Sequence, residues 1–171
     1  IAAFIDRLGV DYWREAIGLF GSYECADTGE GAVLLLSAAR DWLKARGMTS
    51  MRGPWSFASQ EWGLEIEGGT IPPVLMAPHN PAYYPRQLEA FGLAKVKDLL
   101  AYYVDAREGY RFPARFLELT DKVQQRYGIR VRTLDMQQIE RDVQTVVELS
   151  NLSIADNWGY YPVTAAEGKT M

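Results

Sequence analysis

The chain has 171 residues with 48% hydrophobic content, enough to fill a core, and its 18 basic and 22 acidic residues give a formal net charge of −4. It has no basic stripe, which argues against nucleic acid as a partner, and no apolar run near the ~20 residues that span a bilayer, which argues against a membrane partner. The single cysteine, Cys25, excludes an intramolecular disulfide and favours a reducing compartment, so we expect a cytoplasmic protein.

The first third of the chain alternates between strand and helix patterns. Residues 1–6 and 17–23 are apolar and β-prone, and we expect them to pair antiparallel. Residues 32–46 predict a helix, and Gly47 follows where a helix-ending glycine belongs. The apolar stripe of this helix consists of Leu35, Leu36, Ala39, Trp42 and Leu43. A β-rich segment at 49–57 comes next.

The middle of the chain is harder to assign. Residues 58–82 are rich in glycine, proline and aromatic residues and are longer than a usual connection, but their apolar side chains indicate that they pack. Pro85 suits the first turn of a helix over 84–91. Residues 95–104 do not distinguish helix from strand by pattern alone.

The second half begins with a predicted helix over 113–127, which Gly128 ends. Residues 129–134 alternate as a half-buried strand does. Asp135 with Gln138 approximates a capping box for a helix over 136–150. Together the patterns predict an α+β fold, with a mixed, mostly antiparallel sheet and helix 32–46 packed across it.

A candidate phosphate site lies between strand 17–23 and helix 32–46, where Asp27-Thr-Gly-Glu-Gly31 has turn chemistry. A loop that feeds a helix N-terminus presents unpaired N–H groups and the positive end of the helix dipole. Two glycines before a helix are also typical of an ordinary tight turn, and that alternative stays open.

Ala26-x-x-Gly29-x-Gly31-Ala32 resembles the pyrophosphate loop of GNAT acyltransferases, usually written Gln/Arg-x-x-Gly-x-Gly/Ala. Residues 80–93 resemble a late helix of that fold. Further short motifs follow the order of a less-studied, tandem GNAT-like family over nearly the whole chain. They are residues 20–24, 46–48 and 52–54, the pairs Pro72-Pro73 and Tyr83-Tyr84, the pair Asp98-Leu99, and residues 157–167.

The resemblance implies a GNAT-like sheet flanked by helices, lacking the usual N-terminal strand and helices, and it favours a strand over 95–104. Residues 1–107 would be the C-terminal part of one GNAT-like domain, 108–128 a linker helix, and 129–171 the start of a second unit. The chain would then be an internal fragment. Strand 129–134 and helix 136–150 would cover the exposed edge of the first unit, in the same chain or exchanged within a homodimer.

The resemblance also implies an activity, the transfer of an acyl group from acetyl-CoA or another acyl-CoA to an unknown amine. The cofactor cleft would lie between strands 17–24 and 49–57. Glu24, at the end of the first of these strands, is the candidate base, and Tyr84 is the candidate acid. The residues that would face the pyrophosphate are Thr28, Gly29, Glu30, Gly31 and Ala32.

The chain departs from the GNAT pattern at several positions. Ala26 stands where Gln or Arg is usual, and Asp27 and Glu30 place negative charge near the expected phosphates. Leu88 stands where the acid tyrosine is usual, so Tyr84, one helical turn earlier, would substitute. These departures leave open a second hypothesis, a non-catalytic GNAT-like interaction module with a degenerate cofactor loop.

Other candidate residues have simpler interpretations beside the functional ones. His79, the single histidine, is either a second candidate base or a loop residue bonded to backbone. Without a second histidine or a cysteine cluster, we expect no metal site. Cys25 is expected to behave as a small apolar residue rather than a nucleophile. Trp55, Trp62 and Trp158 are expected in the core or a lid.

Overall fold

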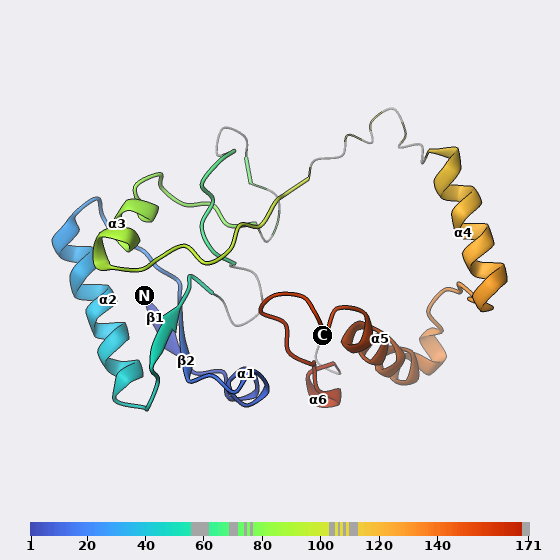
Figure 1. The fold of residues 1–171 in the computed structure, drawn as a ribbon, viewed down its shortest axis with the longest axis horizontal. Coiled ribbons are helices and arrows are strands. Elements are labelled where there is room, and N and C mark those ends of the chain that lie inside the picture. The colour runs from blue at the N-terminus through green and yellow to red at the C-terminus, as the bar shows by residue number, and fades with distance from the viewer. Residues whose placement is uncertain are drawn as a thin grey trace. The chain divides into compact units, whose positions relative to one another are not determined.

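The computed structural model describes residues 1–55, 62–68, 72–73, 75, 77–102, 105, 107, 109 and 113–168. The chain forms two compact units, Ile1–Val96 with Trp158–Tyr161 and Lys97–Asn157 with Pro162–Met171. Helices and a sheet are both present, which confirms the predicted α+β class (Figure 1). In the part of the chain that the structure describes, no helix has the length and apolar character to cross a membrane.

The first unit is built on a mixed sheet whose strands are β1 (Ala2–Phe4), β2 (Ile17–Gly21) and β3 (Ser50–Arg52). β2 lies in the middle, antiparallel to β1 and parallel to β3. The predicted pairing of 1–6 with 17–23 is therefore confirmed, as is the placing of 17–24 and 49–57 in one sheet. Ser56 and Phe57, the end of the second predicted strand, lie outside the described residues.

A short helix that the sequence did not predict joins β1 to β2. It is α1 (Arg7–Trp13), and the side chain of Asp6 caps it by accepting a 3.1 Å hydrogen bond from the Gly9 N–H. Such an N-terminal cap satisfies one of the backbone donors that a helix start leaves unpaired. Seven residues give too short a window for an apolar stripe to be recognised.

Every residue of β2 is buried, because both faces of this central strand are covered. Ile17 and Leu19 belong to a cluster with Trp55, whereas Phe20 packs against α2 and α3. Gly18 lies on the Phe20 side, where a Cβ atom would come within 2.4 Å of the Leu43 side chain. A side chain at this position would therefore push α2 away from the sheet.

The helix across the sheet is α2 (Gly29–Lys44), which begins before the predicted start at Ala32. Its buried stripe consists of Ala32, Leu36, Ala39 and Leu43. Trp42, which we expected on this stripe, is 39% exposed, and the Arg46 guanidinium lies 3.8 Å from its ring centroid. The stripe follows the helical period, and Trp42 falls at its border, where Arg46 rather than the core covers the indole.

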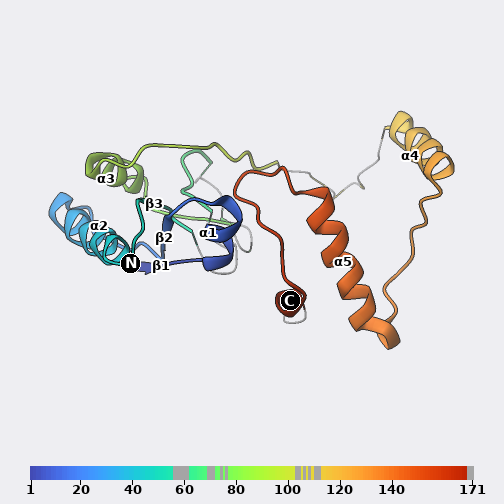
Figure 2. The same ribbon diagram turned by 60° about the horizontal axis from the view of Figure 1, so that its bottom comes forward.

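α3 (Tyr84–Phe91) has the predicted bounds, with Pro85 in its first turn. It packs beside α2, and both helices lie on the same side of the sheet (Figures 1 and 2). The core between α2, α3 and the sheet consists of Phe20, Tyr23, Ala32, Leu36, Tyr84 and Leu88.

The predicted strand over 95–104 is wrong for residues 95–102, which adopt no regular secondary structure, and 103–104 lie outside the described residues. Val96, Leu100 and Tyr102 are all exposed. A strand is stabilised by pairing with a neighbour and by covering one face. Neither condition is met here in the described part of the chain, so the β-prone composition is not sufficient.

The second unit contains α4 (Ala114–Tyr127), whose C-terminal cap is Gly128 in the left-handed region, as predicted. The predicted strand 129–134 is wrong, because this segment has no regular structure and Val131 is 82% exposed. The predicted helix 136–150 is confirmed as a short 3-10 turn, η1 (Met136–Gln138), that continues into α5 (Ile139–Ser153). Figure 2 shows residues 129–134 as an extended segment between α4 and the start of α5.

An ion pair explains why residues 132–135 are held at the start of α5. Arg132 donates two hydrogen bonds, of 2.6 and 2.5 Å, to the carboxylate of Asp142, which also accepts the Asp135 N–H at 2.8 Å. These bonds hold the pKa of Asp142 well below its usual range, and those from Arg132 have the largest effect. The last helix of the described residues is α6 (Ala165–Gly168), which begins with a reciprocal Thr164–Glu167 capping box.

Candidate active site

Residues 23–28, which follow β2, are held by side chains of α3 rather than by a strand partner. The Tyr23 hydroxyl donates to Gln87 Oε1 at 2.9 Å. The amide nitrogen of Gln87 in turn donates to the Ala26 carbonyl at 2.8 Å. Gln87 is buried, so these bonds satisfy polar groups that would otherwise cost free energy to remove from water.

The two predicted catalytic residues, Glu24 and Tyr84, are brought together by this arrangement. The Tyr84 hydroxyl donates a 2.8 Å hydrogen bond to Glu24 Oε2 and accepts one of 3.2 Å from the Cys25 N–H. Tyr84 is buried and Glu24 is exposed. Within the described residues, the second carboxylate oxygen of Glu24 has no hydrogen-bond partner. Glu24 can therefore bind a cation or accept a proton from a molecule outside.

Burial raises the pKa of the Tyr84 hydroxyl above its usual value, and the bond to the Glu24 carboxylate raises it further, although the Cys25 N–H acts in the opposite direction. Burial likewise raises the pKa of the neighbouring Tyr23. Both hydroxyls therefore remain protonated at neutral pH and act as donors. Tyr84 cannot lose its proton readily unless another proton replaces it.

Glu24 and Tyr84 lie in the wall of a cavity of about 200 Å³. The cavity is lined by Tyr23, Glu24, Gly63, Leu64, Ala77, Pro78, His79, Asn80 and Tyr84. Pockets for whole drug-sized ligands usually measure about 300–1,000 Å³, so this volume suits a small polar group or the head of a larger molecule.

His79 also lines the cavity, with an acidic partner that the sequence did not reveal. Its Nδ1 lies 2.9 Å from Glu65 Oε2. Asn80 fixes this pair by accepting the Glu65 N–H at 2.8 Å and donating to the Glu65 carbonyl at 3.2 Å. A hydrogen bond from Nδ1 to a carboxylate leaves Nε2 as the acceptor of the neutral ring. Neither of the two interpretations of His79, base or backbone-bonded residue, anticipated Glu65.

The predicted phosphate-binding residues lie at the start of α2, with Thr28 as the N-terminal cap and Gly29–Ala32 in the first turn. The Thr28 side chain makes no capping bond, and a first turn has N–H groups without partners in the helix. A Cβ at Gly31 would lie 2.8 Å from Thr28 Oγ1, whereas one at Gly29 would meet nothing within 4 Å. Close packing thus explains why position 31 is glycine, but it does not explain why position 29 is.

The acidic character of this loop is partly offset. Arg86, on α3, donates a 2.8 Å hydrogen bond to Asp27, and both side chains are exposed. The pair places a guanidinium beside the start of α2, where the sequence had indicated only negative charge. Glu30 remains exposed in the first turn. The loop therefore keeps one acidic residue that opposes phosphate and gains one base that favours it.

The tryptophans form a cluster on the other face of the sheet, in which Trp55 lies in the core and the partly buried Trp62 and Trp158 pack against it. Trp55 stacks on Trp62 with ring centroids 4.7 Å apart, and Trp158 lies 6.1 Å from Trp55. The Arg52 guanidinium lies 5.1 Å from the Trp158 ring and 5.7 Å from that of Trp13. These contacts join residues 158–161 to the sheet.

The expected cofactor cleft between β2 and β3 is not where the cavity lies. Beyond β3 the Trp55 N–H still donates to the Phe20 carbonyl at 2.8 Å, so β2 and the segment after β3 remain hydrogen-bonded there. The cavity instead lies past the end of β2, at Tyr23 and Glu24.

Two curated relatives align with the whole chain. Protein YghO of Escherichia coli is 33% identical over 172 residues, and a Caulobacter vibrioides protein named bacterial ceramide synthase is 34% identical over 179 residues. The chain spans less than half of each, 43% of the first and 44% of the second. No solved structure and no family model matches. The chain is thus similar over its full length to part of a protein named for making ceramide.

Proposed function

We propose that this chain forms part of an N-acyltransferase that joins an acyl group to the amine of a long-chain amino alcohol. The observation that carries the proposal is the Glu24–Tyr84 pair in the wall of a small cavity. A ceramide is an amide of a fatty acid and a long-chain amino alcohol, so the name of the Caulobacter relative describes the same class of bond. The cavity volume suits the amino alcohol head and leaves the hydrocarbon chain outside.

Glu24 is the group that binds and deprotonates the amine. An amino alcohol enters as an ammonium ion at neutral pH, and the exposed carboxylate attracts it. One proton of the ammonium ion passes to water, which leaves a lone pair free to attack a carbonyl carbon. Glu24 accepts a second proton from the nitrogen as the C–N bond forms. His79 Nε2, in the same cavity, is available as an acceptor for the hydroxyl of the amino alcohol.

Tyr84 is the group that returns the proton. An acyl thioester, such as an acyl-CoA, supplies the carbonyl carbon and a thiolate leaving group. Tyr84 gives its proton to the sulfur while Glu24 passes on the proton taken from the amine along the 2.8 Å hydrogen bond. The C–N bond forms, the C–S bond breaks, and both residues end as they began. This relay suits a tyrosine whose raised pKa prevents it from ionising alone.

The residues that would hold the phosphates of an acyl-CoA are those of the first turn of α2, Gly29 to Ala32, together with Arg86. The uncapped first turn and the nearby guanidinium fit an anion. This placement rests on the GNAT resemblance together with these contacts.

The proposal is tested by incubating the chain with sphinganine and palmitoyl-CoA and measuring the amide by mass spectrometry. Glu24→Gln should lower the rate about 10²-fold or more, since general-base catalysis contributes on that scale. Glu89→Gln, at an exposed position of α3, removes a carboxylate in the same way, so it is the matched control and should leave the rate unchanged. If sphinganine neither binds nor reacts, or if both variants behave alike, the proposal is wrong.

The alternative is a non-catalytic module that has lost the cofactor. The exposed Glu30 in the first turn of α2 favours it, because a carboxylate there repels phosphate. Titration calorimetry with acetyl-CoA distinguishes the two. The acyltransferase requires binding that weakens when a bulky residue replaces Gly29, whereas the module requires none.

A further inference from the structure

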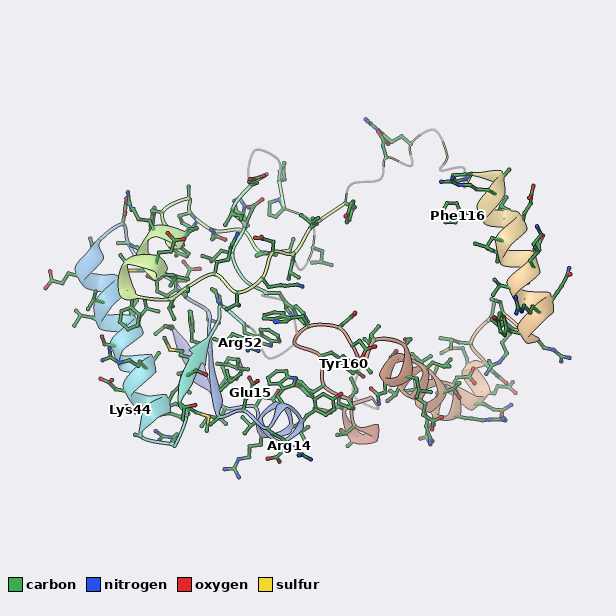
Figure 3. The ribbon with its side chains drawn as sticks, viewed as in Figure 1. Arg14, Glu15, Lys44, Arg52, Phe116 and Tyr160 are labelled. Carbon is green, nitrogen blue, oxygen red and sulfur yellow. The ribbon has the colours of Figure 1, made fainter. Side chains whose placement is uncertain are left out.

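The second unit contains a helix whose apolar side is uncovered in the described residues. On α4, Phe116, Leu119, Val123 and Tyr127 recur at the spacing that places them on one side of a helix. No residue of α4 is buried, and Phe116 and Tyr127 are 49% and 66% exposed. Figure 3 shows Phe116 projecting from the helix. By contrast, the Val143–Val147 side of α5 is covered by α6, where a Cβ on Gly168 would lie 2.5 Å from Val147.

The charges of α4 are sorted by sign around this apolar side. Arg115, Lys122 and Arg126 lie seven and four residues apart, so they form one row along a border of the apolar side. Glu118 and Asp121 fall on the side of the helix opposite the apolar side. The basic residues of α4 therefore lie nearer to the apolar side than its acidic residues do.

Two bases of the row lie close to aromatic rings of the apolar side. The Arg115 guanidinium lies 5.5 Å from the Phe116 ring centroid, and that of Arg126 lies 5.5 Å from the Tyr127 ring. Within the described residues, none of the three bases forms an ion pair. Their positive charge is therefore available to a negative group at the same level as the aromatic rings.

From this arrangement we infer that α4 lies in the headgroup plane of an anionic lipid bilayer, with its apolar side toward the acyl chains. Phosphate headgroups complement the basic row, the aromatic rings enter the boundary below it, and Glu118 and Asp121 face water. The expectation of no membrane partner rested on the lack of a spanning run, but a helix that lies on the surface needs no such run. The inference does not depend on the acyltransferase proposal.

The test is flotation of the full chain with vesicles of equal parts phosphatidylcholine and phosphatidylglycerol, and with vesicles of phosphatidylcholine alone. We expect binding to the first that is strong at low salt and weakens as salt is added. Lys122→Gln should reduce the partition coefficient about fivefold, the effect of one basic residue near an anionic surface. Phe116→Ser should reduce it by a similar factor or more. Neither change removes a buried group, so both variants should stay folded.

Asp121→Asn is the matched control, since it raises the net charge by the same amount that Lys122→Gln lowers it. If α4 binds in the inferred orientation, this change on the water side should alter binding less than twofold. Equal and opposite effects of the two variants would show attraction by net charge alone and overturn the inference. So would an absence of binding to anionic vesicles, or a dimer without lipid that Phe116→Ser dissociates, which would identify a second copy as the occupant.

Discussion

The Tyr84 hydroxyl donates a 2.8 Å hydrogen bond to Glu24, a residue 60 positions earlier in the chain, and accepts one of 3.2 Å from the Cys25 N–H. One buried phenol thus links a backbone group and an exposed carboxylate. Its removal has two separable consequences, one for stability and one for the position of the carboxylate.

For stability, Tyr84→Phe should lower the free energy of unfolding by about 1–2 kcal/mol, because it leaves the Cys25 N–H without its acceptor. Chemical denaturation measures the change. Tyr12→Phe, at an exposed position of α1, is the control and should stay within about 0.5 kcal/mol of the parent. Equal stability of the Tyr84 variant and the parent would show that the hydrogen bond contributes nothing.

Gln87→Leu should destabilise the first unit by about 2–3 kcal/mol. The substitution removes the acceptor of the buried Tyr23 hydroxyl and also the donor to the Ala26 carbonyl. Arg86→Leu, at the neighbouring exposed position, breaks only the surface pair with Asp27 and should cost less than about 1 kcal/mol. Similar melting temperatures for the two variants would contradict this difference.

Gly53→Ala should be among the most damaging single-methyl changes in the chain. The added Cβ would lie 2.2 Å from the backbone oxygen of Phe20, which cannot move without separating β2 from the segment after β3. We expect a loss of about 3 kcal/mol in thermal denaturation. Gly29→Ala adds a methyl that meets nothing within 4 Å and should change stability by less than about 0.5 kcal/mol. A tolerated Gly53→Ala would refute the close approach.

Acid should affect the second unit through Asp142. Its pKa is lowered in the folded state, so the Arg132 pair contributes fully above the ordinary carboxyl pKa of about 3.9 and is lost as pH falls through the lower folded value. Asp142→Asn should therefore destabilise at neutral pH, and its difference from the parent should shrink below pH ~4. Hydrogen exchange at the Asp135 amide measures this locally. A difference independent of pH from 2 to 7 would assign the effect to something other than the carboxylate charge.

The helices from α2 to α5 were predictable because each has a local cause. The buried residues of α2 between Ala32 and Leu43 recur at the helical period, and Pro85 suits the first turn of α3. The strands of the first unit were predicted as well, but the strands expected over 95–104 and 129–134 were wrong, because a strand depends on a partner that composition does not show. Val131 alternates with charged residues as a strand residue does, yet it is 82% exposed and lies in no sheet.

For the candidate site, the sequence supplied Glu24 and Tyr84 but not the reason that they meet. That reason lies in Gln87 and Tyr83, whose bonds to the 23–28 backbone align α3 with it. No sequence pattern indicated Glu65 as a site residue. It lies 14 positions before His79, and the two side chains meet because Asn80 hydrogen-bonds the Glu65 backbone. Hydrogen bonds between distant side chains carry no periodicity for a pattern to reveal.

The hold of α3 on the 23–28 segment makes Cys25 a natural reporter. It is the single thiol of the chain, its carbonyl accepts the Tyr83 hydroxyl at 2.9 Å, and its N–H donates to Tyr84. Its sulfur lies near the first turn of α2, where a Cβ on Gly31 would come within 3.3 Å of it. If α3 and this segment separate, the backbone on both sides of the thiol is released. The rate at which a thiol reagent modifies the unaltered chain then measures how often that opening occurs, and a molecule bound at Glu24 should lower this rate.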